Sequence, residues 1–381
     1  MAGPLASLKV VELVGIGPGP FAAMLLADMG ADVLRIHRTE SVERGFDPGG
    51  IPVLDRNRRS VGVDLKHPDG VETVLRLVES ADALLEGFRP GVTERLGVGP
   101  DVCLARNPKL VYGRMTGWGQ GGPMAQAAGH DIDYIALAGA LAHFGRAGDK
   151  PTPPLNMVGD FGGGGTFLAF GVVCGVLEAR ASGNGQVVDA AMVDGSAVLM
   201  SMMWGLRHLG AFDEEHHGTN VLDTGAPFYD TYECADGAYI AVGALEPQFY
   251  AELLAKTGLA DDGLPKQMDR GGWPRLRARF TQLFRSKTRE EWCALLEGTD
   301  ACFAPVLTTD EAALHPHNKA RGTYVDIDGI IQPAPAPRFS RTIPDQPIPP
   351  QPNDPEQAET ALAAWLKPRE IAALRKAGVF D

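Results

Sequence analysis

Two titratable side chains, His130 and Asp160, stand in stretches of sequence that favour chemistry over packing. His130 lies within the segment Gly129–Tyr134, and Asp160 comes just before the glycine run Gly162–Gly165. An imidazole titrates near neutral pH, and a carboxyl group can serve as its partner acid or base. On opposite faces of one carbon atom, the two groups could remove a proton from one face and return a proton to the other. This is the chemistry that inverts a stereocentre beside a carbonyl group.

Each of these residues also has a purely structural interpretation. His130 could cap a helix or lie in a core, and Asp160 could be the N-cap of a helix that the glycines open. A third candidate, Glu246 in the segment Ala244–Gln248, is typical of an acidic side chain at a helix start.

Length and composition limit the kinds of protein that the chain can be. Its 381 residues predict two domains, and 44% hydrophobic with 22% charged residues is ordinary for a globular protein. The formal net charge of -13 argues against a nucleic-acid partner, because neutralising phosphates requires surplus lysine and arginine.

Cysteines, histidines and apolar runs give further expectations. The five cysteines have no CxxC spacing, so we expect reduced thiols and a cytoplasmic protein. There is no signal-peptide pattern, and the longest apolar stretch, Phe167–Leu177, is too short for a membrane span. His216, His217, His315 and His317 match no zinc-binding pattern, so we predict no metal.

The elements that must position the candidates are mostly strands and helices in alternation. Strands are expected at 8–13, 32–36, 60–64, 82–86, 109–114 and 187–190, and helices at 21–29, 71–80, 166–180 and 191–210. This rhythm predicts an α/β fold whose large domain is a Rossmann-like parallel sheet covered by helices.

The second half of the chain changes character. A hairpin with an Asp-Gly turn at 232–242 opens a smaller α+β domain, and nine prolines between 333 and 355 predict an extended connector before two final helices. The expected domains are a large domain (1–190 and 330–381), a linker helix region (191–224), a small domain (225–320) and a Pro-rich return linker (321–355).

Arginines gather where the predicted strands end or begin. They are Arg35, Arg38, Arg56, Arg58, Arg59, Arg89 and Arg95. Guanidinium groups suit phosphate oxygens, and the carboxyl ends of parallel strands face the ligand crevice, so the cluster favours a phosphorylated ligand. The segment Gly15–Pro20 is not a dinucleotide fingerprint, because Pro20 stands where a glycine is required.

Several segments together resemble the family III CoA-transferase superfamily. They include Leu26–Val33, Asn57–Val61, Asp64–Lys66, Glu86–Gly91 and the C-terminal Gly378–Phe380. The segments Gly129–Tyr134 and Val158–Gly164 resemble its α-methylacyl-CoA racemase branch. One departure is the segment Val42–Asp55, which is rich in glycine and proline and looks longer than in close racemases.

The resemblance implies the fold, the assembly and the binding residues. The fold would be an interlocked homodimer of the family III CoA-transferase type, with an active site between the large domain of one chain and the small domain of the other. Matching CoA-binding or substrate-binding positions are Arg38, Val63, Asp64, Leu65, Lys66, Gly87, Phe88, Arg89, Arg95, Gly129, Asp131, Ile132, Asp133, Tyr134 and Asn156. No separate cofactor is implied, since CoA is part of the substrate.

The resemblance also implies a reaction. The chain would interconvert (2R)- and (2S)-2-methylacyl-CoA, with His130, Asp160 and Glu246 as catalytic residues and backbone N–H groups around Asp131 stabilising the enolate. Methionines at 192, 200, 202 and 203 could form an adaptable surface for the acyl chain, or ordinary helix core. Three alternatives stay open: a CoA-transferase with Asp160 as nucleophile, a non-catalytic CoA-binding subunit and, more remotely, a nicotinamide oxidoreductase.

Overall fold

The computed structural model describes residues 2–38, 52–351 and 355–379. Most of the unusual segment Val42–Asp55 therefore lies outside the described residues. The chain divides into two compact units. The large unit comprises Met1–Ala138, Pro154–Met200 and Gly322–Asp381, and the small unit comprises Gly139–Pro153 and Ser201–Arg321.

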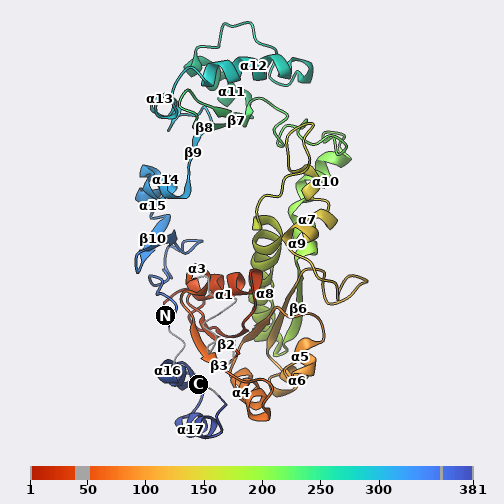
Figure 1. Cartoon of the computed structure of the whole chain (residues 1–381), viewed down its shortest axis with the longest axis vertical. Helices are drawn as coiled ribbons and strands as arrows, with labels where there is room; N and C mark the ends of the chain where they lie inside the picture. Colours follow the sequence, from red (N-terminus) through yellow and green to blue (C-terminus); the bar gives the residue numbers. More distant parts are fainter. Residues whose placement is uncertain (1, 39–51, 352–354, 380–381) are drawn as a thin grey trace. The chain divides into compact units, whose positions relative to one another are not determined.

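A six-stranded sheet in the order β3-β2-β1-β4-β5-β6 forms the centre of the large unit (Figure 1), and all its neighbouring strands are parallel. The strands are β1 (Lys9–Leu13), β2 (Asp32–His37), β3 (Arg59–Gly62), β4 (Ala83–Glu86), β5 (Val111–Thr116) and β6 (Gln186–Ala191). The order reverses between β1 and β4, as in a Rossmann fold, so a crevice is expected there at the carboxyl edge. The predicted α/β class is confirmed.

Helices cover both faces of this sheet. They are α1 (Pro18–Asp28), α3 (Pro52–Asp55), α4 (Pro68–Glu79), α5 (Val92–Arg95), α6 (Pro100–Arg106), α7 (Asp131–Leu137), the π-helical segment η2 (Met157–Gly165), α8 (Thr166–Ser182), α9 (Met192–Leu199), α16 (Pro355–Ala363) and α17 (Pro368–Lys376). Alternate strand residues point to opposite faces. Val11 therefore packs with α4, α6, α16 and α17, whereas Val10 packs with α1 and α8.

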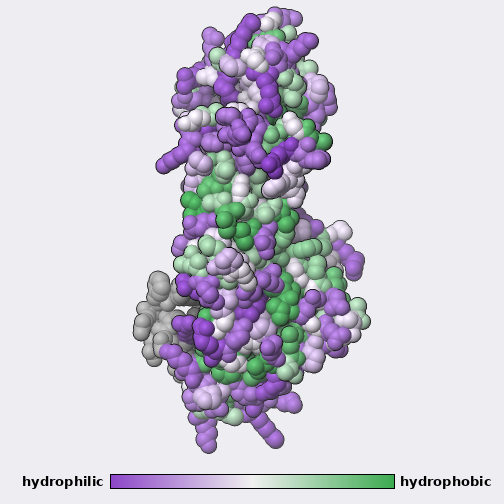
Figure 2. Space-filling view, turned by 90° about the vertical axis from the view of Figure 1, so that its right-hand side faces the viewer, coloured by the Kyte–Doolittle hydropathy of each residue, from purple (hydrophilic) through white to green (hydrophobic). Residues whose placement is uncertain are grey.

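Large apolar side chains remain exposed on four adjoining helices of the large unit. Figure 2 views the chain from the side that carries α7, α9 and β6 in Figure 1, and hydrophobic side chains gather there. The exposed apolar residues on and beside α7, η2, α8 and α9, here called the apolar surface, are Ile132, Leu137, Leu155, Met157, Phe170, Leu177, Val198 and Leu199. A patch of this kind favours a contact with another macromolecule.

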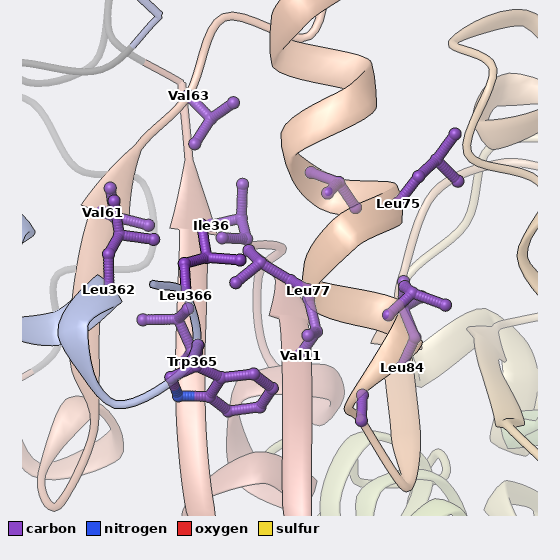
Figure 3. Packing of buried hydrophobic residues seen from close by; sticks show 14 of the residues in the cluster. Val11, Ile36, Val61, Val63, Leu75, Leu77, Leu84, Leu362, Trp365 and Leu366 are labelled. Carbon is purple, nitrogen blue, oxygen red and sulfur yellow. The ribbon is translucent and has the colours of Figure 1, made fainter. Parts of the chain in front are cut away.

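The C-terminal segment returns to the edge of the sheet at β3. Figure 3 shows Leu362, Trp365 and Leu366 against strand residues that include Ile36 and Val61. All five side chains are buried, with exposed fractions of 8% or less. Residues that are about 300 positions apart in sequence thus share one hydrophobic core, which ties the C-terminus to the strands that begin the chain.

The helical segment Met157–Ser182 differs from its prediction. The sequence predicts a helix from Thr166, but helical backbone begins at Met157 with the π-helical segment η2. The 26 residues are long and apolar enough to cross a membrane by length and composition, and 44% of their most apolar window is buried in the fold. The segment packs against α1, α9, β5 and β6, which is the position of a core helix in this unit.

The small unit is built around a three-stranded antiparallel sheet, β7-β8-β9. Its elements are η1 (Leu141–His143), α10 (Ser201–His208), β7 (Tyr229–Glu233), β8 (Tyr239–Gly243), α11 (Pro247–Thr257), η3 (Arg270–Gly272), α12 (Trp273–Phe284), α13 (Arg289–Leu296), β9 (Phe303–Val306), α14 (Thr309–Leu314) and α15 (Pro316–Arg321). Aromatic residues of α12 and α13 fill its core, including Phe280, Phe284 and Trp292. The predicted hairpin is present, and Gly237 of its turn has φ of 77°, where glycine is favoured.

Two further elements differ from their predictions. The helix predicted at 191–210 is two helices, because α9 ends at Leu199 and α10 begins at Ser201. The segment 321–355, predicted as a Pro-rich linker, begins with an antiparallel hairpin of β10 (Tyr324–Ile327) and β11 (Ile330–Pro333). The five cysteines are all free, as predicted.

Backbone contact between η2 and α9 leads to a first prediction, the change of Gly195 to Ala. A Cβ atom at Gly195 would overlap the carbonyl oxygen of Gly163, and one at Gly163 would lie 2.6 Å from the N atom of Ser196. The added methyl group must displace backbone, so we expect the free energy of unfolding to fall by at least about 1–3 kcal/mol. Urea titration followed by intrinsic fluorescence measures the loss.

The matched control for this change is Gly205→Ala on α10. A Cβ atom there meets open space. Alanine has the higher helix propensity, so this variant should be unchanged or more stable by up to about 1 kcal/mol. Equal stability of the Gly195→Ala variant and the wild-type chain would show that the two helices do not pack backbone to backbone.

Candidate active site

A pocket of about 370 Å³ opens at the carboxyl edge of the central strands. Its wall is formed by the segments that follow β1, β4, β5 and β6, by the start of α7 and by η2. The lining residues are Ile16, Gly17, Pro18, Gly87, Phe88, Arg89, Pro90, Met115, Thr116, Gly117, Trp118, Ala125, Ala127, Ala128, Gly129, His130, Tyr134, Asp160 and Met192. The pocket therefore lies where the strand order reverses, and it brings His130 and Asp160 together.

His130 is held by the first turn of α7. Its backbone N–H donates to a carboxylate oxygen of Asp133 at 2.9 Å, and its carbonyl oxygen accepts the N–H of Asp133 at 2.8 Å. His130 is the N-cap residue of α7, but its side chain makes no capping hydrogen bond. The capping interpretation thus accounts for the backbone alone, and the imidazole is exposed and lines the pocket.

An aromatic pair supports the loop that precedes His130. The Tyr134 hydroxyl donates to the carbonyl oxygen of Gly129. The ring of Trp118 packs edge-on against the Tyr134 ring, with 4.7 Å between the ring centroids. Burial raises the pKa of Tyr134, and the nearby charges of Asp160 and Asp133 act in the same direction. The hydroxyl therefore stays protonated and remains a hydrogen-bond donor.

Asp160 lies inside the π-helical segment η2. Its backbone N–H donates to Asp131 Oδ2 at 2.7 Å, and its side-chain Oδ2 accepts a hydrogen bond from Asn156 Nδ2 at 2.9 Å. The interpretation of Asp160 as the N-cap of α8 is wrong, because the N-cap residue of that helix is Gly165. A Cβ atom on Gly17, where φ is 73°, would lie 3.4 Å from Asp160 Oδ2, so the carboxylate faces the loop after β1.

The surroundings of Asp160 favour its protonated form. Burial raises the pKa of Asp160 above its ordinary value, and the negative charge of Asp131 adds to this effect. The hydrogen bond from Asn156 and the proximity of His130 act in the opposite direction. A carboxyl group with a raised pKa is better suited to exchanging protons near neutral pH than an ordinary aspartate.

A buried ion pair shapes the pocket wall at Gly87–Pro90. Glu86 Oε2 accepts the backbone N–H of Phe88 at 2.7 Å, and Glu86 Oε1 accepts a hydrogen bond from Arg114 Nε at 2.8 Å. Burial raises the pKa of Glu86, while these hydrogen bonds and the charge of Arg114 lower it. Gly87, Phe88 and Arg89 line the pocket, where the sequence predicts a CoA-binding segment.

The other predicted CoA-binding residues do not line this pocket. They are Arg38, Val63, Asp64, Leu65, Lys66 and Arg95, together with the substrate-binding candidates Asp131, Ile132, Asp133 and Asn156. Arg38 and Val63 follow β2 and β3 at the same edge of the sheet. Val63 is buried in the core and its backbone N–H donates to the carbonyl oxygen of His37, whereas Arg38, Lys66 and Arg95 are exposed.

Three of the clustered arginines are buried and bind carboxylates of the large unit. Arg58 and Arg35 contact Glu12 and Asp55, and burial lowers the pKa of Arg58. Arg56 donates to both carboxylate oxygens of Asp28 and to Gln332 Oε1. Arg59, which is partly exposed, pairs with Asp32. The prediction that these four arginines bind a phosphorylated ligand is wrong, because internal carboxylates already neutralise them.

The remaining candidates, apart from Met192, lie outside the pocket wall. Glu246 is the exposed N-cap residue of α11 in the small unit, and Ile132 is exposed on α7. Among the four methionines, Met192 lines the pocket, whereas Met200, Met202 and Met203 do not. Within the described ranges 2–38, 52–351 and 355–379, no group of three or more His, Cys, Asp or Glu side chains could hold a metal ion.

Sequence reasoning missed several residues of the pocket. They are Ile16, Gly17, Pro18, Pro90, Met115, Thr116, Gly117, Trp118, Ala125, Ala127 and Ala128. A signal for the first three was present, because Gly15–Pro20 joins a predicted strand to a helix at the carboxyl edge. The alanines carry no chemical signal, and only the course of the loop after β5 brings them to the pocket.

A wider groove of about 1090 Å³ lies in the small unit. Arg277 and Arg285 in its wall bind Asp230 and Glu233, and His216 binds Asp213. This groove contains none of the residues that the sequence predicts to be catalytic. Its larger volume is therefore a weaker guide to chemistry than the groups that meet in the smaller pocket.

The raised pKa of Asp160 predicts how stability depends on pH. The fold disfavours the charged carboxylate, so the free energy of unfolding decreases as the pH rises from the unfolded pKa of about 3.9 through the higher folded pKa. The variant Asp160→Asn lacks this charge and can still accept the hydrogen bond from Asn156. We expect it to unfold at a higher temperature than the wild-type chain at pH 7, with a gain that shrinks towards pH 4.

The control for that comparison is Asp101→Asn, an exposed aspartate in the first turn of α6. It removes one negative charge from the large unit without touching the pocket. The test compares the melting temperatures of the wild-type chain, Asp160→Asn and Asp101→Asn at several pH values. A gain for Asp160→Asn that grows as the pH falls would have the wrong sign and would show that the carboxylate is stabilised in the fold.

Comparisons with known proteins agree with this architecture. Residues 5–359 match the family described as CoA-transferase family III. The α-methylacyl-CoA racemases of Mus musculus and Homo sapiens are 47% and 45% identical over 339 residues, which span 89% of this chain and 87% of each relative. A crystal structure of a CAIB/BAIF family protein from Brucella suis has a TM-score of 0.80 at 24% identity, covers 96% of this chain and 100% of its own, and shows the shared fold. The chain belongs to CoA-transferase family III.

Proposed function

We propose that this chain is an α-methylacyl-CoA racemase that interconverts (2R)- and (2S)-2-methylacyl-CoA thioesters. The observation that carries the proposal is the meeting of His130 and Asp160 in one pocket, each on a different structural element. The identity of 47% and 45% to two racemases supports it. A titratable imidazole opposite a carboxyl group suits proton transfer to and from carbon.

The reaction proceeds through an enolate. The thioester carbonyl acidifies the hydrogen on C2, and either His130 or Asp160 removes it to leave a planar carbanion. The other residue, in its protonated form, returns a proton to the opposite face. The raised pKa of Asp160 serves this exchange of roles, because a strongly acidic carboxyl group would be a poor base for a carbon acid.

Stabilisation of the enolate oxygen supplies much of the acceleration. Asp131 is the first residue of α7, so its N–H has no acceptor within that helix and can donate to the oxygen. One such donor is typically worth about 3–4 kcal/mol. Asn156 holds the Asp160 carboxylate, and Glu246 is assigned to orient the imidazole of His130.

The CoA portion of the substrate binds along the carboxyl edge of the sheet. Its proposed contacts are Arg38, the backbone of Val63–Lys66, Gly87–Arg89 and Arg95. Exposed cations among these residues can pair with phosphate oxygens. The thioester end would reach Gly129–Tyr134, and Met192 would contact the acyl chain. No separate cofactor takes part, because CoA is part of the substrate. The reaction takes place in the cytoplasm.

The chain acts as an interlocked homodimer. Support comes from the apolar surface on α7, η2, α8 and α9, whose eight residues are 45–75% exposed within one chain. A second copy of the chain would bury these side chains and stabilise the association. In such a dimer, an active site between the large unit of one chain and the small unit of the other would bring Glu246 to the His130 of a second chain.

The dimer can be tested by changing the apolar surface. The mass in solution should be about twice the 40.5 kDa of one chain. Phe170→Glu introduces a charge on α8, which a dimer interface would have to bury at a cost of several kcal/mol, so the variant should be monomeric. Light scattering after size-exclusion chromatography measures both masses. Val102→Glu on α6 is the control for an exposed apolar residue away from this surface, and it should stay dimeric.

The reaction itself can be followed in heavy water. With a single enantiomer of a 2-methylacyl-CoA, we expect the C2 hydrogen to be replaced by deuterium and the configuration to invert. His130→Ala removes one of the two proton carriers, so the rate of inversion should fall by about 10²–10⁴-fold. Nuclear magnetic resonance detects the exchange, and chiral chromatography of the hydrolysed acid detects the inversion. His317→Ala, an exposed histidine of α15, is the control.

The competing functions give different results in the same assay. A CoA-transferase with Asp160 as nucleophile moves CoA to an added carboxylate and leaves the C2 hydrogen in place. A non-catalytic CoA-binding subunit binds CoA but changes neither group. Full inversion by the His130→Ala variant would be incompatible with the proposed catalytic pair.

A further inference from the structure

We infer that the Asp131 side chain is a positioning residue, which fixes Asp160 relative to His130 by binding the backbone of Asp160. This inference rests on the proposed racemase function and assigns a role to a carboxylate that does not line the pocket. In the proposed reaction Asp131 also contributes its backbone N–H, and the two roles use different atoms of the residue.

The contact joins the two elements that carry the catalytic pair. Asp131 follows His130 directly and begins α7, and its Oδ2 accepts the N–H of Asp160 in η2 at 2.7 Å. The residues are 29 positions apart in sequence. One hydrogen bond therefore links the backbone next to the imidazole to the backbone of the carboxylic acid, and it sets the separation between them.

The contact is also tightly enclosed. Asp131 is only 6% exposed, and a Cβ atom on Gly159 would lie 2.6 Å from Asp131 Oδ2. Glycine at 159 therefore lets the backbone of η2 come close enough to receive the carboxylate. A larger residue at either position would push Asp160 away from the start of α7.

The placement of this carboxylate is costly for folding. Asp131 Oδ1 is buried and has no hydrogen-bond partner among the residues that the structure describes. A buried polar atom without a partner destabilises the folded state. Packing alone does not account for an aspartate at this place, whereas the need to hold Asp160 does.

The charge of Asp131 also acts on Asp160. It raises the pKa of Asp160, as does burial, which is the larger effect. The other groups that act there are His130 at the start of α7 and Asn156 in the loop before η2, and both lower the pKa of Asp160. Tyr134 lines the same pocket, and its hydroxyl stays protonated. Removing the charge of Asp131 should therefore lower the pKa of Asp160.

Two substitutions separate the hydrogen bond from the charge. Asp131→Ala removes both, leaves the N–H of Asp160 without its acceptor and frees η2 to shift. A displacement of about 1 Å can cost 10²-fold in rate, so we expect inversion to fall about 100-fold. Asp131→Asn keeps an oxygen acceptor of the same shape, so inversion should stay within about tenfold of the wild-type rate.

The informative readout is exchange of the C2 hydrogen in heavy water, measured separately for each enantiomer. In Asp131→Ala, His130 can still exchange the hydrogen on its own face with retention of configuration. We expect exchange without inversion for one enantiomer and loss of exchange for the other. A merely structural role would reduce both together, in proportion to the folded protein. Asp101→Asn in the first turn of α6 is the matched control.

The pH profile gives a second, independent readout. In Asp131→Asn the limb of kcat/KM that reports deprotonation of Asp160 should move to lower pH, because a neighbouring negative charge has been removed. This variant keeps the shape of the side chain and decides the matter if Asp131→Ala fails to fold. An unchanged pH profile together with equal loss of both exchange reactions would overturn the inference.

The controls also separate this inference from the proposed function. If the wild-type chain neither exchanges nor inverts a 2-methylacyl-CoA, the racemase proposal fails. If the wild-type chain inverts its substrate and Asp131→Ala does so at the same rate, the racemase proposal stands and only the role of Asp131 is wrong.

Discussion

The close contact between the backbones of η2 and α9 is the constraint on which the site depends. Gly163 and Gly195 meet with no room for a Cβ atom on either residue. The segment η2 has π-helical backbone at this contact, and Asp160 lies in the same segment. π-Helical turns are rare and often occur at functional sites. The glycine run after Asp160 is therefore a packing requirement that also places a carboxyl group at the pocket.

The order of the strands decides where that pocket lies. The reversal between β1 and β4 separates the loops that follow them, so that Gly17 and Gly87–Pro90 stand on the wall of one cavity. The loop after β5 supplies the third wall, and it carries His130 to the start of α7. The sheet thus fixes the loops, and the loops bring together residues that are distant in sequence.

The sheet could be predicted from the sequence because its signal is local. Runs such as Val10–Leu13 and Val33–Ile36 are short and apolar, and helices alternate with them. His130 and Asp160 could also be identified from the sequence, because their polar and glycine-rich surroundings are unusual. The π-helical backbone could not be predicted, because no local pattern marks it, and Gly163 within it packs against Gly195 of α9, which is distant in sequence.

The prediction that Arg35, Arg56, Arg58 and Arg59 bind a phosphorylated ligand is wrong for a related reason. Arg56 and Arg58 are typical of a phosphate site by type and place, but their partners Asp28 and Glu12 come from other elements. A one-dimensional pattern shows which groups are charged and does not show which are already neutralised. The hairpin β10–β11 was not predicted, because the prolines that follow it suggested an extended linker. Its turn is formed by Asp328 and Gly329, which both have positive φ.

The two members of the proposed catalytic pair lie in unlike environments, and this difference has a chemical consequence. His130 is exposed, whereas Asp160 is partly buried, and an ordinary aspartate is a much stronger acid than an imidazolium group. A reversible transfer between two faces of one carbon works best when the two groups have similar proton affinities, because neither direction is then strongly uphill. Burial and the charge of Asp131 both move the pKa of Asp160 towards that of an imidazole. The partial burial of η2 therefore does more than place a carboxyl group, because it also raises the pKa of the aspartate, which is the direction that favours proton exchange with a histidine.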